Sequence, residues 1–449
     1  MEYANAIIER KKLANKETIQ MCERFIRDLA NEEYDFNPKD AEFVIQIIEK
    51  TFVHDKGERL DGTPLRGEPF ILEPWQKFII YNLLGFFHKG TGIRRFKEAF
   101  IFLPRKNGKT RFVAALSWAL ALLERKSGST IYIVGAALRQ AKQAFGFINF
   151  NLQQMGEDHN FRILDNNQES SISGDLGDGS LHIEALAANP ERQDSLNCNI
   201  AIADEIHAYK NATQYNVIKE AMKAYTNKLM IGITTAGDNQ NSFCYNRLVY
   251  CQKILDGSVK DEQYFVFIAK ADEDEEGNVD YTSAEEHEKA NPNYGVTIRA
   301  DDIMNDALQA QNDPQQRKDF LAKSLNIYTS SMRAYFNIDE FRTSNAHAEK
   351  VLKLDGLTQE EKLKELSKLD IYWYGGADLS KMHDLTATAL YGHYKDIDIA
   401  ITHAFFPIVR AYEKADEDNI PLFGWMDDGV LTMTNTPTTD YNDVVRWFM

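Results

Sequence analysis

Short apolar runs alternate along this chain with longer segments whose apolar residues recur at helical spacing. The short runs predict buried strands at 99–103, 131–135, 181–186, 199–204, 228–237 and 264–269. After the strand 99–103, apolar residues recur at helical spacing from Phe112 to Leu123, which predicts a helix. The same spacing over 138–155 predicts another. Strands that alternate with helices predict a mostly parallel sheet with helices on both faces.

Helical patterns also flank this alternating region on both sides. Residues 3–33 are expected to form one amphipathic helix, and residues 40–52 and 72–87 two more. Downstream, short helices are predicted at 284–290, 301–311 and 314–325. The first 330 residues therefore predict one α/β domain with N-terminal helices and a lid-like helical subregion.

The pattern changes after residue 330. Residues 331–369 are charged and show little strand pattern, which predicts a linker and a domain boundary. A second domain is predicted over 370–449, with strands at 371–378, 385–393 and 397–406. No strand is expected between residue 406 and Met449. Three antiparallel strands with an acid on the first resemble the start of an RNase H-type sheet.

Composition narrows the class of protein. The 449 residues are 43% hydrophobic, which supports large buried cores, and the net charge of −17 argues against a wholesale nucleic-acid coat. This charge does not exclude a local basic channel. Basic residues gather at 89–97 and 219–228, although solvated helix faces account for both groups slightly more simply. Four cysteines without a CxxC pair fit a reducing cytoplasm and give no zinc signal. No signal peptide or membrane-spanning run is predicted.

A phosphate-binding loop is predicted at 103–110, LPRKNGKT, between the strand 99–103 and the helix that follows. Gly108 lets the backbone approach a phosphate, Lys109 faces the β- and γ-phosphates, and Thr110 can hold Mg²⁺. Leu103 stands where the standard motif has its first glycine, so the match is imperfect. Upstream, Gln76 can read an adenine edge, or it is an ordinary surface Gln beside a core Trp.

Two further strand ends carry groups suited to nucleotide chemistry. The strand 199–204 ends in Asp204 and Glu205, which could hold Mg²⁺ and polarise an attacking water, or form a solvated pair. The strand 228–237 ends in Thr-Thr-Ala-Gly, whose hydroxyls can sense a γ-phosphate; a plain strand exit is the alternative. In the second domain, Asp378 closes a strand and Asp384 follows it. On the residues alone, Asp378 is more simply a lone acid at a strand end than a metal ligand.

The ordered set EPWQ, LPRKNGKT, IAIADEIHAY, GITTAG, ANPNYG and GGADLSKMHDLTA resembles the large terminase subunit of tailed bacteriophages. The resemblance covers nearly the whole chain. It implies an α/β fold with an additional-strand P-loop ATPase domain and an RNase H-like nuclease domain. It implies ATP-driven translocation of double-stranded DNA into a procapsid, and endonuclease cleavage of concatemeric DNA.

Carried over by position, the resemblance gives each motif a role. The nucleotide-binding residues become Gln76, Arg105, Lys106, Asn107, Gly108, Lys109 and Thr110, with Arg105 also catalytic. The Walker B pair becomes Asp204 and Glu205, and the coupling motif Thr234, Thr235 and Gly237. Asp378 becomes the first nuclease metal ligand, with Asp384 beside it. The implied cofactors are ATP and Mg²⁺, with Mn²⁺ as a substitute in the nuclease site.

The resemblance also implies partners and a place of action. These are double-stranded DNA, a small terminase subunit, a portal protein and further copies of the chain in a ring. The expected location is the host cytoplasm, docked on the procapsid and absent from the mature virion. One departure matters: the family's nuclease continues with strands and a helix that bring two more carboxylates, whereas this sequence ends at Met449. We therefore expect a truncated chain or an incomplete nuclease site.

Two other functions compete with the motor. A helicase-like DNA-dependent ATPase would share the P-loop, but the GGADLS block argues against it, because a helicase is expected to carry a second RecA-type half. A nucleotide-binding scaffold that assembles without turnover would have no need for Glu205 as a base.

Overall fold

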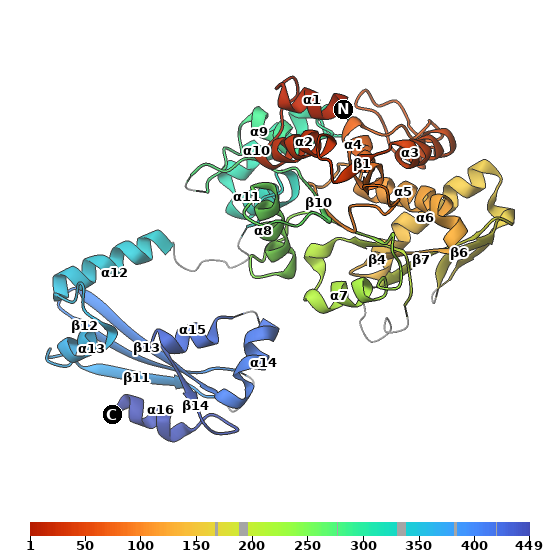
Figure 1. Cartoon of the computed structure of the whole chain (residues 1–449). Coiled ribbons are helices and arrows are strands. Elements are labelled where there is room, and N and C mark those ends of the chain that lie inside the picture. Colours follow the sequence, from red (N-terminus) through yellow and green to blue (C-terminus); the bar gives the residue numbers. More distant parts are fainter. Residues whose placement is uncertain (167–168, 188–195, 276, 330–337, 381–383, 419) are drawn as a thin grey trace. The chain divides into compact units, whose positions relative to one another are not determined.

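The computed structural model describes residues 1–166, 169–187, 196–275, 277–329, 338–380, 384–418 and 420–449. It divides into two units, Met1–Ser331 and Met332–Met449 (Figure 1). Within the described residues, no helix is both long and apolar enough to cross a membrane.

The first unit is built on an eight-stranded sheet in the order β10-β3-β9-β8-β4-β7-β6-β5. Its strands are β3 (Glu98–Phe102), β4 (Ser129–Gly135), β5 (Arg162–Asp165), β6 (Ser170–Asp175), β7 (Ser180–Ala187), β8 (Ile200–Asp204), β9 (Leu229–Thr234) and β10 (Tyr264–Ile268). Neighbours from β10 to β7 pair in parallel, and β6 and β5 pair antiparallel. The additional strand β9 separates the phosphate-loop strand β3 from β8. The predicted α/β class and mostly parallel sheet are confirmed.

Helices cover both faces of this sheet (Figure 1). They are α1 (Glu2–Ile8), α2 (Lys16–Leu29), α3 (Lys39–Thr51), α4 (Pro74–Gly85), α5 (Lys109–Glu124), α6 (Leu138–Met155), α7 (Ala212–Glu220) and α8 (Phe243–Leu255). Connections between parallel strands are right-handed, so the direction of a connection along the sheet decides which face its helix covers. Helices α5 and α6 lie in connections that run from β3 toward β7, and they cover one face. Helices α7 and α8 lie in connections that run back toward β10, and they cover the other.

Two features of the first unit differ from the sequence prediction. The single helix expected over 3–33 is wrong: α1 and α2 are separate, because Arg10 adopts a left-handed φ of 56° that an α-helix cannot accommodate. Strands β5 and β6 were not predicted, because their sequences RILD and SSISGD lack an apolar run.

A helical subregion with its own small core lies within the first unit. It contains α9 (Ala284–Ala290), α10 (Ala300–Asn312) and α11 (Pro314–Ser324). Its core is formed by Ala271, Ala290, Ile303, Ala307, Ala310, Phe320, Leu325 and Ile327. We call residues 271–327 the lid.

The second unit is a four-stranded sheet in the order β11-β12-β13-β14 with five helices among its described residues. Its elements are α12 (Ile338–Leu352), α13 (Gln359–Leu366), β11 (Trp373–Asp378), β12 (Thr386–Tyr394), β13 (Ile397–Pro407), α14 (Ile408–Asp418), α15 (Leu422–Asp427), β14 (Leu431–Thr434) and α16 (Tyr441–Phe448). The three predicted antiparallel strands are confirmed.

The expectation that no strand follows residue 406 is wrong. Helices α14 and α15 lead to β14, which pairs in parallel with β13. The strand is only four residues long, LTMT, too short to give a periodic signal. Of the predicted linker, residues 331–337 lie outside the described part, and the remainder contains α12 and α13.

Candidate nucleotide and nuclease sites

The loop between β3 and α5 has the backbone of a phosphate-binding loop. Lys106 and Gly108 adopt left-handed φ angles of 68° and 77°, and Gly108 is the N-cap of α5. Left-handed residues of this kind turn successive backbone N–H groups into a concavity that suits an anion, at the positive end of the helix. Thr110 is half-buried in the first turn of α5, where its hydroxyl can reach a cation at the loop.

The ammonium group of Lys109 is turned into its own loop. Nζ donates to the carbonyl oxygens of Leu103 and Pro104, each at 2.9 Å, and also contacts Oγ1 of Thr235. Burial lowers the pKa of Lys109 to about 8, against the opposing charges of Glu205 and Asp204. The amine is therefore held by neutral oxygens that a phosphate can replace.

Asp204 ends β8 and is 3% exposed. Burial, and then the charge of Glu205, raise the pKa of Asp204 to about 7, while Lys109 opposes the shift. Among the described residues, its Oδ1 atom has no hydrogen-bond partner. A buried carboxylate oxygen without a partner suits Mg²⁺ or a water bound to it, so Asp204 and Thr110 fit the predicted metal.

Glu205 follows at a strained position. Its φ of 55° is left-handed, and its N–H donates to the carbonyl of Ile233 on β9 at 2.8 Å. Strain of this kind is retained where the surrounding structure imposes it, often at functional sites. Burial raises the pKa of Glu205, but the hydrogen bond from His207 and the charge of Lys109 outweigh it, so the net pKa is lowered. The side chain is thus an ionised carboxylate, as a base must be.

The predicted coupling motif follows β9, so it lies between the phosphate loop after β3 and the Asp204–Glu205 pair after β8. Thr235 contacts Lys109, while Oγ1 of Thr234 accepts the N–H of His207 at 3.0 Å. A Cβ atom at Gly237 would lie 3.4 Å from both His207 and Tyr328, so the chain passes closely there. The two threonines therefore contact the phosphate loop on one side and the turn after β8 on the other.

Three buried asparagines join the phosphate loop to the lid. Nδ2 of Asn107 donates to Oδ1 of Asn291 at 2.9 Å, and the N–H of Asn293 donates to Oδ1 of Asn107 at 3.1 Å. Nε1 of Trp75, at the start of α4, donates to Oδ1 of Asn293 at 2.7 Å. We call Asn107, Asn291 and Asn293 the asparagine clasp. Its hydrogen bonds hold the phosphate loop against the lid.

The contacts of Gln76 and Arg105 do not assign either side chain to a nucleotide. Gln76 is 3% exposed, and its Oε1 accepts the N–H of Glu73 at 2.9 Å, which caps α4. Arg105 is exposed, and its N–H donates to the carbonyl of Lys323 at 2.9 Å. The adenine contact of Gln76 and the catalytic role of Arg105 stay predictions.

The basic cluster at 89–97 is largely structural. Arg94 pairs with Glu124, and Arg95 pairs with Asp28 and Glu262; both arginines are almost fully buried. These two guanidinium groups face carboxylates within the unit, and neither is available to a DNA phosphate.

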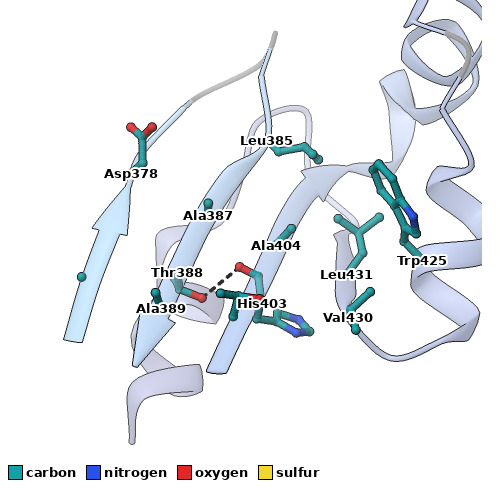
Figure 2. Close-up of a pocket in the computed structure, with 12 residues that line it drawn as sticks. Asp378, Leu385, Ala387, Thr388, Ala389, His403, Ala404, Trp425, Val430 and Leu431 are labelled. Atoms are coloured by element: carbon teal, nitrogen blue, oxygen red, sulfur yellow. Dashed lines mark hydrogen bonds between the residues drawn. The ribbon is translucent and has the colours of Figure 1, made fainter. Parts of the chain in front are cut away.

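In the second unit, Asp378 stands exposed at the end of the edge strand β11. Strand register places it in one row across the sheet with Ala387 and Ala404. Figure 2 shows its carboxylate at one edge of a pocket of about 470 Å³, with Trp425 at the opposite edge. Ala387 and Ala404, the residues in register with Asp378, line the pocket, so the sheet surface directly beside the carboxylate carries only small side chains.

The structure does not assemble a two-metal site around Asp378 from the described residues. Asp384 has an 84% exposed side chain and lies 3.5 Å from Nζ of Lys414. Nowhere in the described ranges do three His, Cys, Asp or Glu side chains gather as a metal site. Two dications held close together need several carboxylates, and Asp378 and Asp384 alone are too few to hold them.

Two groups of contacts were not predicted. The ANPNYG segment contains Asn291 and Asn293, and the DEIH segment contains His207, but neither segment carries a pattern that assigns these side chains a partner. Their partners lie 184, 186 and 27 residues away in sequence, so only an alignment or a structure could reveal them.

Comparisons with known proteins agree with this arrangement. Residues 74–253 match the family model for the ATPase domain of the terminase large subunit, and residues 258–449 match the model for its endonuclease domain. The chain is 26% identical to protein YmfN of Escherichia coli (strain K12) over 265 residues, 58% of this chain and 56% of that protein. It is also 26% identical over 413 residues to the large terminase subunit of Enterobacteria phage HK97, covering 90% of this chain and 73% of that one.

A solved structure has the same fold. The crystal structure of the HK97 bacteriophage large terminase superposes with a TM-score of 0.53 at 21% sequence identity. The match covers 91% of this chain and 76% of that chain.

Proposed function

This chain belongs to the terminase large subunit family, and on that premise we propose that it is an ATP-driven motor that moves double-stranded DNA into a viral procapsid. One observation carries the ATPase part of the proposal. Lys109, Asp204 and Glu205 meet at one edge of the sheet, with Thr235 of the intervening strand contacting Lys109. That arrangement provides a phosphate-binding charge, a cation ligand and a base within a single site.

The residues divide the hydrolysis of ATP between them. Lys109 and the backbone of residues 105–108 bind the phosphates, and Gln76 contacts the adenine. Glu205 orients and polarises the attacking water, and Arg105 stabilises charge on the transferring phosphoryl group. Mg²⁺, when held by Thr110 and Asp204, offsets negative charge on the β- and γ-phosphates.

Binding of ATP is coupled to the lid through the phosphate loop. When Lys109 turns to the phosphates, it leaves Thr235 and the two carbonyl oxygens that hold it now. The asparagine clasp passes any change in the loop to the lid, because Asn107 is bonded to Asn291 and Asn293. Each turnover can thus move the lid relative to the sheet.

The second unit belongs to a metal-dependent endonuclease for concatemeric DNA, with Asp378 as its first ligand and Mg²⁺ or Mn²⁺ as the metal. Because the described residues gather no three-ligand site beside Asp378, DNA cleavage requires further carboxylates. The match to the endonuclease family model supports this assignment. The motor works as a ring of copies docked on the portal of the procapsid in the host cytoplasm, with a small terminase subunit. Its net charge of −17 is compatible with DNA that touches only a channel.

ATP turnover by the full chain, with and without linear double-stranded DNA, tests the proposal. Double-stranded DNA should raise the rate, most strongly when procapsids and the small subunit are present. Lys109→Ala should reduce turnover to background, because it removes the charge that faces the β- and γ-phosphates. Lys11→Ala is the matched control, since Lys11 is an exposed lysine paired with Glu9 and lies outside both basic groups. A folded Lys109→Ala protein with wild-type turnover would overturn the proposal.

A further inference from the structure

His207 lies between the predicted base and the coupling motif. Its Nδ1 atom is 3.0 Å from Oε2 of Glu205 and 3.0 Å from Oγ1 of Thr234. Its backbone N–H also donates to Oγ1 of Thr234 at 3.0 Å. The Thr234 hydroxyl in turn donates to the carbonyl of Thr235 at 3.2 Å. The single ring nitrogen Nδ1 thus faces an oxygen from each of two strand ends.

The position of the imidazole ring is fixed from the β9 side. Thr234 is fully buried and contacts both the backbone and the ring of His207. Gly237 approaches so closely that a Cβ atom there would be 3.4 Å from Cβ of His207. The backbone of His207 and its Nδ1 atom are therefore both tied to the end of β9.

The Oε2 atom of Glu205 is buried, and among the described residues no well-aligned hydrogen bond fixes it. The backbone of Glu205 is left-handed, and its side chain is 24% exposed at the edge of the site. A carboxylate without such a bond depends on a neighbouring group to select its rotamer, and general-base efficiency depends on the reacting atoms being aligned. Nδ1 of His207, 3.0 Å from Oε2, is a group that can select it.

We propose that His207 is a positioning residue that holds the Glu205 carboxylate toward the attacking water and ties that position to Thr234 at the end of β9. A shift of β9 when Lys109 leaves Thr235 would then reach the base through His207. This inference rests on the proposed ATP hydrolysis. The competing role for His207 is purely structural, and substitutions at His207 and Glu205 separate the two.

The experiment measures steady-state ATP turnover by the full chain carrying substitutions at His207. His207→Ala should lower kcat about tenfold to a hundredfold, the cost of a misplaced catalytic group, with KM for ATP changed less than about twofold. His207→Asn places an amide nitrogen where Nδ1 stands and should restore most of the lost turnover. His207→Gln places its amide near the position of Nε2 and should not restore it.

A double variant distinguishes positioning from structure. If His207 acts through Glu205, adding His207→Ala to Glu205→Gln should lower kcat no further, because the base is already absent. The control is His182→Ala, which breaks another Glu–His pair two residues apart, 3.2 Å between Nε2 and Glu184 on β7. It should keep wild-type turnover.

Each outcome bears on the inference. Additive losses in the double variant, or failure of His207→Asn to restore turnover, would overturn the positioning role while leaving the ATPase assignment intact. Wild-type turnover in Glu205→Gln would instead overturn Glu205 as the base, and His207 with it. Rescue by Asn and not by Gln, together with non-additivity, supports the proposal.

Discussion

Replacing Asn107 by Ala should weaken ATP binding by loosening the contact between the phosphate loop and the lid. Asn107 is fully buried, and its amide makes two hydrogen bonds to the lid: Nδ2 to Oδ1 of Asn291, and Oδ1 from the N–H of Asn293. Alanine removes both and adds no new contact. The loop would then keep its backbone bonds to Lys323 and Thr297 of the lid but lose both side-chain bonds of Asn107.

The expected loss of free energy follows from the two hydrogen-bond partners that Asn107 leaves behind. Asn291 and Asn293 are 1% and 3% exposed, so the acceptor of one and the N–H of the other would become buried and unsatisfied. Each such group costs about 1–3 kcal/mol, which gives about 2–6 kcal/mol in total. If about half of this, about 1–3 kcal/mol, is lost from the nucleotide-binding conformation, Kd for ATP rises about fivefold to 150-fold.

The assay combines urea unfolding with titration of a fluorescent non-hydrolysable ATP analogue. The matched control is Asn151→Ala on α6, where a fully buried amide also makes two bonds: Oδ1 from the N–H of Val53 at 2.7 Å, and Nδ2 to the carbonyl of Phe147 at 3.0 Å. Both variants should lose similar unfolding free energy. Only Asn107→Ala should lose nucleotide affinity.

One result would refute the reasoning. If Asn107→Ala binds the analogue with wild-type Kd while its unfolding free energy falls as much as that of Asn151→Ala, the clasp only stabilises the fold. Equal losses of affinity in both variants would show that any buried cavity in the unit has the same effect.

Three further predictions concern the base, the half-buried His403 and the nuclease. Glu205→Gln should bind ATP normally and cleave it about a hundredfold more slowly or worse, measured by single-turnover quench, because general-base help is lost; weakened binding with intact cleavage would contradict the assigned role. Burial lowers the pKa of His403 below its usual 6.5, so the unfolded chain binds more protons there. As pH falls through 6.5, hydrogen-exchange protection of β13 and β14 should therefore decrease in the wild type. This dependence of protection on pH should be absent in His403→Gln. Plasmid cleavage in Mn²⁺ should be weak or absent, since the described residues gather no three-ligand metal site beside Asp378; strong cleavage that Asp378→Ala abolishes would show that further ligands complete the site.

The sequence alone determined the elements whose signal is local. An apolar strand, a Gly-Lys-Thr loop and an apolar helix lie within 26 residues of one another, so the phosphate loop was predictable from spacing and residue type. The same holds for Asp204 and Glu205, because two carboxylates directly after a buried strand lie at the edge of the sheet where ligands bind. In both cases neighbouring residues supply the physical constraint, and no distant contact is needed.

The tertiary structure decided what depends on strand order and on distant partners. Insertion of β9 between β3 and β8 brings Thr235 to Lys109 across 126 residues and Thr234 to His207 across 27. The clasp joins Asn107 to residues 184 and 186 positions away, and burial turns Arg94 and Arg95 from candidate DNA contacts into internal ion pairs. Hydrogen-bond partners and burial depend on how the chain packs, so the periodicity of apolar residues along the sequence does not predict them.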